Sequence, residues 1–141
     1  MNLSQSEVET YLEQVKDAVR QNRYRLSLNS NRSDNRRLFA HYLIKENDVP
    51  GIIMSLTYQD FSEAVPNEHP QFRHETLYVF GKELELIERF GSGKKLVPLY
   101  IKFNKLDDNY VIIVSFHEEH YPLKNIFIKR SVLQTEALVF L

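Results

Sequence analysis

The second half of the chain is a succession of apolar segments separated by short turns, and this pattern limits the fold more than any other feature. Residues 76–80, 96–103 and 110–116 are rich in β-branched and aromatic side chains. Gly-Ser-Gly at 91–93 and Asp-Asp-Asn at 107–109 supply turns between them. Parallel pairing would need crossovers of about a dozen residues. The short connections therefore favour an antiparallel meander, with residues 110–116 as its central strand.

The first half predicts helices. Apolar residues recur at helical spacing through residues 8–19, and Ser4 or Ser6 is placed to cap this first helix, which should run to about residue 22. Residues 23–29 alternate and predict a short strand. Further helices are expected around residues 38–43 and from residue 48, followed by a short segment that Thr57 caps and Pro66 ends.

Three segments outside these helices and strands differ in what their sequences indicate. The polar stretch at residues 67–75 predicts a loop, residues 125–129 are a candidate for another strand, and residues 131–141 show no clear period. We therefore predict a single α+β domain over residues 1–141, with N-terminal helices packed on one face of a mainly antiparallel sheet.

Composition narrows the classes of function. The chain of 141 residues has no cysteine, which excludes disulfides and thiolate zinc sites. Without an apolar run of about 20 residues or a signal-peptide pattern, we expect a cytoplasmic protein with no membrane partner. Eighteen basic against nineteen acidic residues argue against a protein that coats nucleic acid non-specifically. Six arginines between residues 20 and 37 form a local basic segment, either an RNA-binding patch or a solvated face.

Three side chains on two predicted strands point to chemistry. Because side chains alternate along a strand, Tyr100 and Lys102 share one face, as do Ser115 and His117. If these strands pair, a phenol, an ammonium group and an imidazole meet. Metal-free RNA cleavage needs a base for the ribose 2′-OH, a cation for the phosphorane and an acid for the leaving oxygen. These residue types are also common on half-exposed strands, so ordinary surface residues remain an alternative.

Other motifs in the sequence could indicate a metal site, a nucleotide-binding loop or a serine nucleophile. The histidines at 69, 74, 117 and 120 lie among glutamates, so a metal-dependent hydrolase remains an alternative. The HExxH zinc motif is absent, and we expect neither metal nor cofactor. The segment GSGKK at residues 91–95 lacks Walker spacing. No GxSxG elbow is present.

The order of motifs in residues 55–118 resembles the MqsR-type toxins of the RelE-like superfamily. The motifs are SLTYQDF at 55–61, LYVFGK at 77–82, LYIKF at 99–103 and IVSFHE at 113–118. The resemblance implies a compact RelE-like α+β toxin of a bacterial type II toxin-antitoxin system, which cleaves mRNA without metal and is neutralised by an antitoxin. The family's strand Tyr and Lys fall on Tyr100 and Lys102, and its basic residue after SF falls on His117.

The chain also departs from the family pattern. The family's basic residue after DF has no counterpart at Ser62 or Glu63, and its polar residue before the first strand aligns only loosely with His74 or Glu75. The hairpin at residues 82–96 and the arginine-rich first half are additional. These departures predict different recognition of substrate or partner.

The leading hypothesis is therefore an mRNA endoribonuclease, acting on mRNA free or on the ribosome, with a cognate antitoxin as partner. His117 would be general acid or base, Lys102 would stabilise phosphate charge, and Tyr100 would donate a proton or position the RNA. The predicted RNA-binding residues are Arg23, Arg25, Arg32, Arg36, Lys82, His69 and His74. The alternative is a non-catalytic protein-binding module, antitoxin-like or immunity-like, which uses the same polar face.

Overall fold

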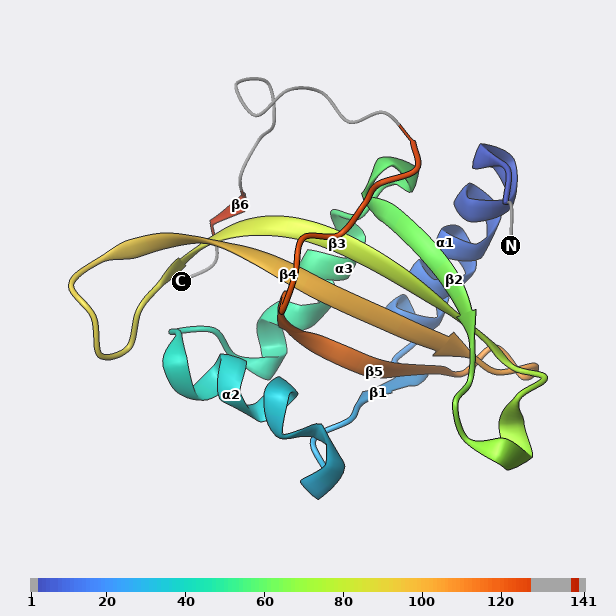
Figure 1. The fold of residues 1–141 in the computed structure, drawn as a ribbon, viewed down its shortest axis with the longest axis horizontal. Helices are drawn as coiled ribbons and strands as arrows, with labels where there is room; N and C mark the ends of the chain where they lie inside the picture. The colour runs from blue at the N-terminus through green and yellow to red at the C-terminus, as the bar shows by residue number, and fades with distance from the viewer. Residues whose placement is uncertain (1–2, 128–137, 140–141) are drawn as a thin grey trace.

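A twisted sheet forms the centre of the protein, as the computed structural model shows in Figure 1. The structure describes residues 3–127 and 138–139. The strands run in the spatial order β1-β5-β4-β3-β2, and a short β6 pairs with β3. Their bounds are β1 Tyr24–Leu26, β2 Phe61–Pro66, β3 Thr76–Ile87, β4 Lys94–Lys105, β5 Val111–Glu118 and β6 Leu138–Val139. Strands β2 to β5 form the antiparallel meander that the short turns predict.

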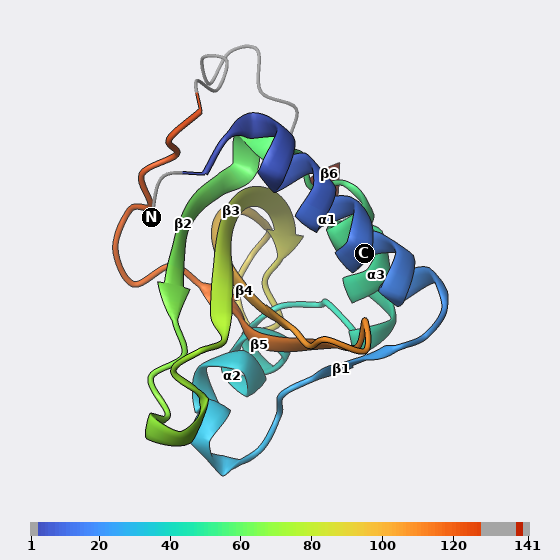
Figure 2. The ribbon, with the colours of Figure 1, turned by 90° about the vertical axis from the view of Figure 1, so that its right-hand side faces the viewer.

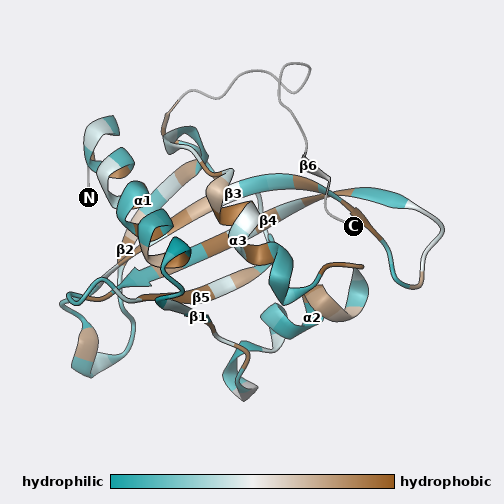
Figure 3. Ribbon diagram, turned by 180° about the vertical axis from the view of Figure 1, so that it is seen from behind, coloured by the Kyte–Doolittle hydropathy of each residue, from teal (hydrophilic) through white to brown (hydrophobic). Residues whose placement is uncertain are grey.

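Two of the three helices cover one face of this sheet and the third lies at its β5 edge, so the predicted α+β class is confirmed. The three helices are α1 (Gln5–Arg20), α2 (Ser33–His41) and α3 (Val49–Met54). Figures 2 and 3 show α1 and α3 against one side of the sheet, while α2 lies beside β5. Of the two possible caps, Ser4 forms the capping box, with Glu7 as the reciprocal partner.

The core lies between α1, α3 and the helix-facing side of the sheet. On β4, Val97, Leu99, Ile101 and Phe103 occupy alternate positions and are fully buried. They meet the apolar stripe of α1 in one continuous cluster. Burial of this apolar surface is the main stabilising term of the fold. None of the described helices is long and apolar enough to span a bilayer.

The opposite face of the sheet is crossed by residues 119–127, which follow β5 (Figure 2). Leu123 in this segment lies over Gly81 of β3, where a Cβ would come within 2.9 Å of the Leu123 Cδ1. The Ser62 hydroxyl donates to the Lys124 carbonyl at 2.8 Å. Residues 125–127 of the predicted 125–129 strand form no strand, and 128–129 lie outside the described residues.

Several local predictions were wrong. Thr57 caps only the 3-10 turn Tyr58–Asp60, and strand β2 follows where a continuous segment was expected. A register shift between Phe61 and Glu63 breaks the alternation that would have revealed this strand. The predicted strand within residues 23–29 is present as β1, and its parallel pairing with β5 agrees with a sheet that is mainly, not wholly, antiparallel. The middle of the sheet is β4 rather than β5.

Candidate functional site

The edge of β5 is completed by a side chain rather than by a strand. β1 pairs with only the first three residues of β5. Beyond them, the Asn35 side chain donates to the Val114 carbonyl at 3.0 Å and accepts from the Phe116 N–H at 2.8 Å. Its amide also donates to the Ser27 carbonyl at 2.8 Å. Asn35 is only 1% exposed, so these bonds fix the start of α2 against β5.

The three predicted catalytic side chains do converge on one face. Tyr100 lies directly opposite His117 in the β4–β5 register, and Lys102 lies opposite Ser115. The Tyr100 and His117 rings are stacked, with centroids 5.2 Å apart and planes 8° apart. The Lys102 ammonium nitrogen lies 5.9 Å from the Tyr100 ring centroid. This is the face that the helices leave uncovered, and all three side chains are partly buried.

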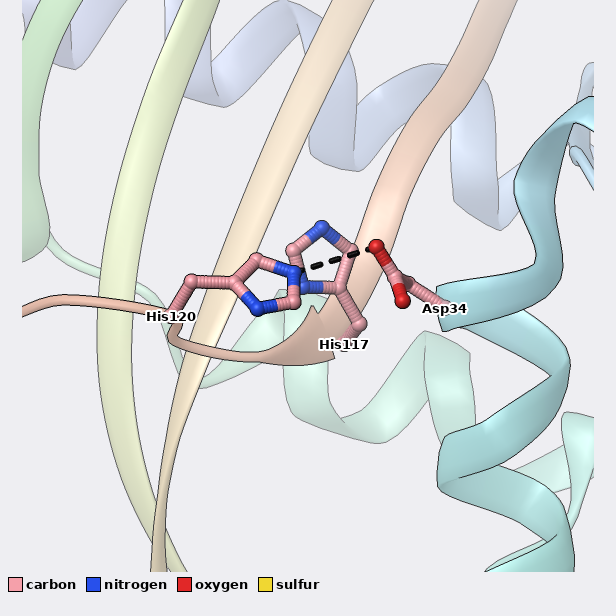
Figure 4. Close-up of side chains that lie close together, drawn as sticks. All are labelled: Asp34, His117 and His120. Atoms are coloured by element: carbon pink, nitrogen blue, oxygen red, sulfur yellow. Dashed lines mark hydrogen bonds and ion pairs between the residues drawn. The ribbon is translucent and has the colours of Figure 1, made fainter.

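Two further polar groups join this face, as Figure 4 shows. The chain turns back after β5 and brings the His120 ring to a centroid distance of 5.0 Å from the His117 ring. His120 Nε2 lies 3.0 Å from an oxygen of Asp34, which α2 supplies. The other Asp34 oxygen accepts a hydrogen bond from Arg37 at 3.3 Å. Asp34, His117 and His120 therefore form a polar cluster built from two elements far apart in sequence.

The tautomer of His117 follows from its backbone contact. His117 Nδ1 lies 2.8 Å from the Glu118 carbonyl oxygen. Since a carbonyl only accepts, Nδ1 carries the proton in the neutral ring and Nε2 keeps its lone pair. The neutral imidazole can thus accept a proton at Nε2.

Burial alters the acid–base behaviour of all three side chains. It lowers the pKa of His117, and His120 and Lys102 act in the same direction, against the Glu118 carbonyl and Asp34. Burial also lowers the pKa of Lys102, with Arg32 adding to the effect and Glu68 and Glu63 opposing it.

The pKa of the Tyr100 phenol shifts in the opposite direction, upward. Burial raises the pKa of Tyr100 to about 12, with contributions from Tyr121, Glu63 and Glu68. The Tyr100 phenol is therefore protonated at neutral pH, when it is able to donate a proton. Side chains with such shifted pKa values gather at functional sites more often than elsewhere.

A hollow of about 170 Å³ opens beside the cluster. Its walls come from α2 and from the end of β5, and they are Asp34, Arg37, Leu38, His41, Tyr42 and residues 117–120. Most of its lining residues are polar or charged, and both imidazoles border it, so a phosphate group, a water molecule or an ion in the hollow would be next to them. A larger groove of about 690 Å³ lies between α1 and the β4–β5 turn and includes none of the predicted catalytic residues.

Of the four predicted RNA-binding arginines, two lie at β1 and two lie in α2 and the 3-10 turn before it. Arg25 is paired in register with Ile112 and therefore projects from the same face as Lys102. Arg32 acts electrostatically on Lys102, which places it near the site. Arg36 is exposed on α2, beside Asn35. Arg23 donates to the Asp108 carbonyl at 2.7 Å, at the β4–β5 turn.

The other predicted binding residues lie apart from this cluster. The Lys82 ammonium group lies 3.7 Å from a carboxylate oxygen of Asp60, and its side chain is 17% exposed. In the register Lys82 faces Leu99, on the helix-facing side. His69 and His74 are exposed on either side of Phe72 in the β2–β3 loop, which contains the short turn Pro70–Phe72.

Comparison of the chain with protein-family models, curated proteins and solved structures finds no significant match. The MqsR-like assignment therefore stays a prediction.

Sequence reasoning missed Asp34 and Asn35 as parts of the site. Neither residue belongs to a motif or a periodic pattern that would mark it as part of a site. Their partners are 86 and 81 residues away along the chain. The sequence shows His120 only as one of four histidines among glutamates, and it does not predict the turn that folds His120 back toward His117. Only the tertiary packing of α2 against β5 brings these groups together.

Proposed function

We propose that the protein is a metal-independent endoribonuclease of the toxin type, acting on mRNA. The observation that carries this proposal is the convergence of His117, Tyr100 and Lys102 on one face of the sheet. A base, a proton donor and a cation within one surface are the groups that this reaction requires. The motif order that resembles MqsR-type toxins supports the same reading.

The reaction divides among these groups as follows. The Nε2 of neutral His117 takes the proton of the ribose 2′-OH, and the 2′ oxygen forms a bond to phosphorus. The bond from phosphorus to the 5′ oxygen breaks, and the 5′ oxygen takes a proton from Tyr100 or from protonated His120. The Lys102 ammonium group stabilises the negative charge of the phosphorane. The products are a 2′,3′-cyclic phosphate and a 5′-hydroxyl.

The surroundings of the site suit an RNA substrate. Arg25 projects from the same face, and the charge of Arg32 is close enough to lower the pKa of Lys102, so both arginines would contact phosphates. Tyr100 offers a ring on which a base can stack. A cognate antitoxin that neutralises such a toxin would need to cover this face.

Cleavage of single-stranded RNA by the purified protein in the presence of EDTA tests the proposal. Wild type should give products with 2′,3′-cyclic phosphate ends, and His117→Ala and Lys102→Met should lower the rate by about 100-fold or more. The matched control is Lys105→Met, because Lys105 lies on the same strand but contacts the Tyr11 ring on the helix-facing side. In cells, wild type should arrest growth and His117→Ala should not.

Two results would overturn this function. Full activity in His117→Ala would remove the proposed base. Activity that EDTA abolishes and a divalent cation restores would instead indicate the metal-dependent hydrolase.

A non-catalytic binding module is the second candidate. The β3–β4 hairpin exposes Phe90 to 87% and Leu96 to 46%, and Leu43 nearby is 40% exposed. Exposed apolar groups of this kind are typical of protein-binding surfaces. A stable complex with RNA or a protein, without any turnover in the assay above, would favour this candidate.

A further inference from the structure

We infer that Asp34, His117 and His120 form a binding site for one divalent transition-metal ion, of which Zn²⁺ is the best match. Each residue offers one donor atom, and the three atoms lie within 4.8 Å of one another (Figure 4). Among the described residues, this is the one group of three or more such side chains that meets at this distance.

The donor types fit this class of ion. Two imidazole nitrogens and one carboxylate oxygen, with open positions for water, are ligands that Zn²⁺ and its first-row neighbours accept. Bonds of about 2.0–2.2 Å from the ion to each ligand place neighbouring donor atoms about 3–3.6 Å apart. His120 Nε2 and the Asp34 oxygen already lie 3.0 Å apart. A small rotation of the exposed His120 would close the remaining distance.

Two features hold the ligands in place without the ion. Asn35 fixes the start of α2 against β5 and thereby positions the neighbouring Asp34. The stack with Tyr100 restricts the ring of His117. The adjoining hollow of about 170 Å³ has room for water on the open side of the ion. An ion at this point would replace the direct contact between His120 and Asp34.

The site would also regulate the proposed function. His117 cannot serve as a proton acceptor while it is bound to a metal ion. The lone pair of Nε2 then binds the ion, and Nδ1 already carries a proton. On the basis of the proposed RNA cleavage, Zn²⁺ should act as an inhibitor. This second step depends on the function, whereas the binding itself does not.

Titration of the purified, EDTA-treated and desalted protein with Co²⁺ and Zn²⁺ tests the binding. We expect one ion per chain, visible absorption bands of bound Co²⁺, and their loss when Zn²⁺ displaces it. His120→Ala and Asp34→Ala should each weaken Zn²⁺ binding by about tenfold or more. His69→Ala is the matched control, since that exposed histidine lies in the β2–β3 loop and should leave the affinity unchanged.

The variants also separate a binding effect from a folding effect. His120 and Asp34 are solvent-accessible, so their alanine variants should melt within a few degrees of wild type without metal. Absence of Co²⁺ bands in wild type, or equal affinity in wild type and both variants, would overturn the site.

Cleavage assays then distinguish the two proposals. If the metal-free protein cleaves RNA and saturating Zn²⁺ leaves the rate unchanged, the inhibitory role is wrong. If the protein binds Zn²⁺ with the expected variant pattern but never cleaves RNA, the metal site stands and the endoribonuclease proposal falls.

Discussion

Replacement of Asn35 by alanine should destabilise the whole domain, because this one side chain substitutes for a missing stretch of β-strand. The Asn35 amide makes three hydrogen bonds to backbone groups of β5 and of the segment after β1. The Asn35 side chain is only 1% exposed, so bulk water does not reach these backbone groups in the folded protein. Alanine would leave the Phe116 N–H and the Val114 and Ser27 carbonyls without this partner.

The magnitude follows from the environment of each group. A buried N–H without a partner costs about 1–3 kcal/mol, and each lost hydrogen bond to a partly buried carbonyl costs about 0.5–1.5 kcal/mol. We therefore expect Asn35→Ala to lower the free energy of unfolding by about 3 kcal/mol or more. With a urea dependence of about 2 kcal/mol per molar, the unfolding midpoint should fall by about 1.5 M.

Urea unfolding followed by circular dichroism measures this change. The matched control is Asn47→Ala, an exposed asparagine in the 3-10 turn Glu46–Asp48, which should change the free energy by less than about 0.5 kcal/mol. A loss below about 1 kcal/mol in Asn35→Ala would show that water or a backbone shift replaces the amide. In that case Asn35 would not be what fixes α2 against β5.

Three further predictions concern single side chains. Burial lowers the pKa of Lys102, so its charge opposes folding at neutral pH, and stability rises as pH increases through the folded-state pKa. Lys102→Met should therefore raise the urea midpoint at pH 7 while it lowers the rate of RNA cleavage, and a lowered midpoint would contradict this reasoning. Burial and the neighbouring Tyr78 raise the pKa of Tyr11 far above its usual value of 10.0, so the contribution of Tyr11 to the free energy of unfolding should be constant below about pH 9 and fall above about pH 10. Tyr11→Phe should flatten that decline in urea titrations at both pH values. Gly81→Ala should lower the free energy of unfolding by about 1 kcal/mol, because its Cβ would meet the Leu123 side chain at 2.9 Å. In a double-mutant cycle, the additional change Leu123→Ala should cancel part of that loss.

The meander and the polar face could be predicted because both depend on short-range rules. Short turns impose antiparallel neighbours, and alternation along β4 places Tyr100 and Lys102 on the face away from Ile101. The same rule places Ser115 and His117 on one face of β5, but it does not set the register with β4. A β-bulge between Lys102 and Phe103 shifts the pairing by one residue and brings His117 opposite Tyr100, which the turn and the local pattern alone do not predict.

The rest of the site depends on long-range packing that no local pattern encodes. Parallel pairing of β1 with β5 leaves half of the β5 edge open, and α2 fills it through Asn35. Only then does Asp34 reach His120. β2 was missed for a different reason, because its bulge buries two successive residues, Phe61 and Ser62, and so hides the period of two.

Stability and function are coupled at the junction of α2 and β5, and this decides how variants should be interpreted. Asn35 completes the strand edge, while the adjacent Asp34 contacts His120 without being buried. Loss of metal binding or cleavage in an Asn35 variant would therefore report on the position of the whole helix. If His120→Ala loses metal binding or cleavage while its unfolding midpoint is unchanged, the loss can be assigned to the imidazole itself. That side chain adds little to the packing. Therefore only variants that leave stability unchanged, such as His120→Ala, can assign a chemical role to a side chain on this face.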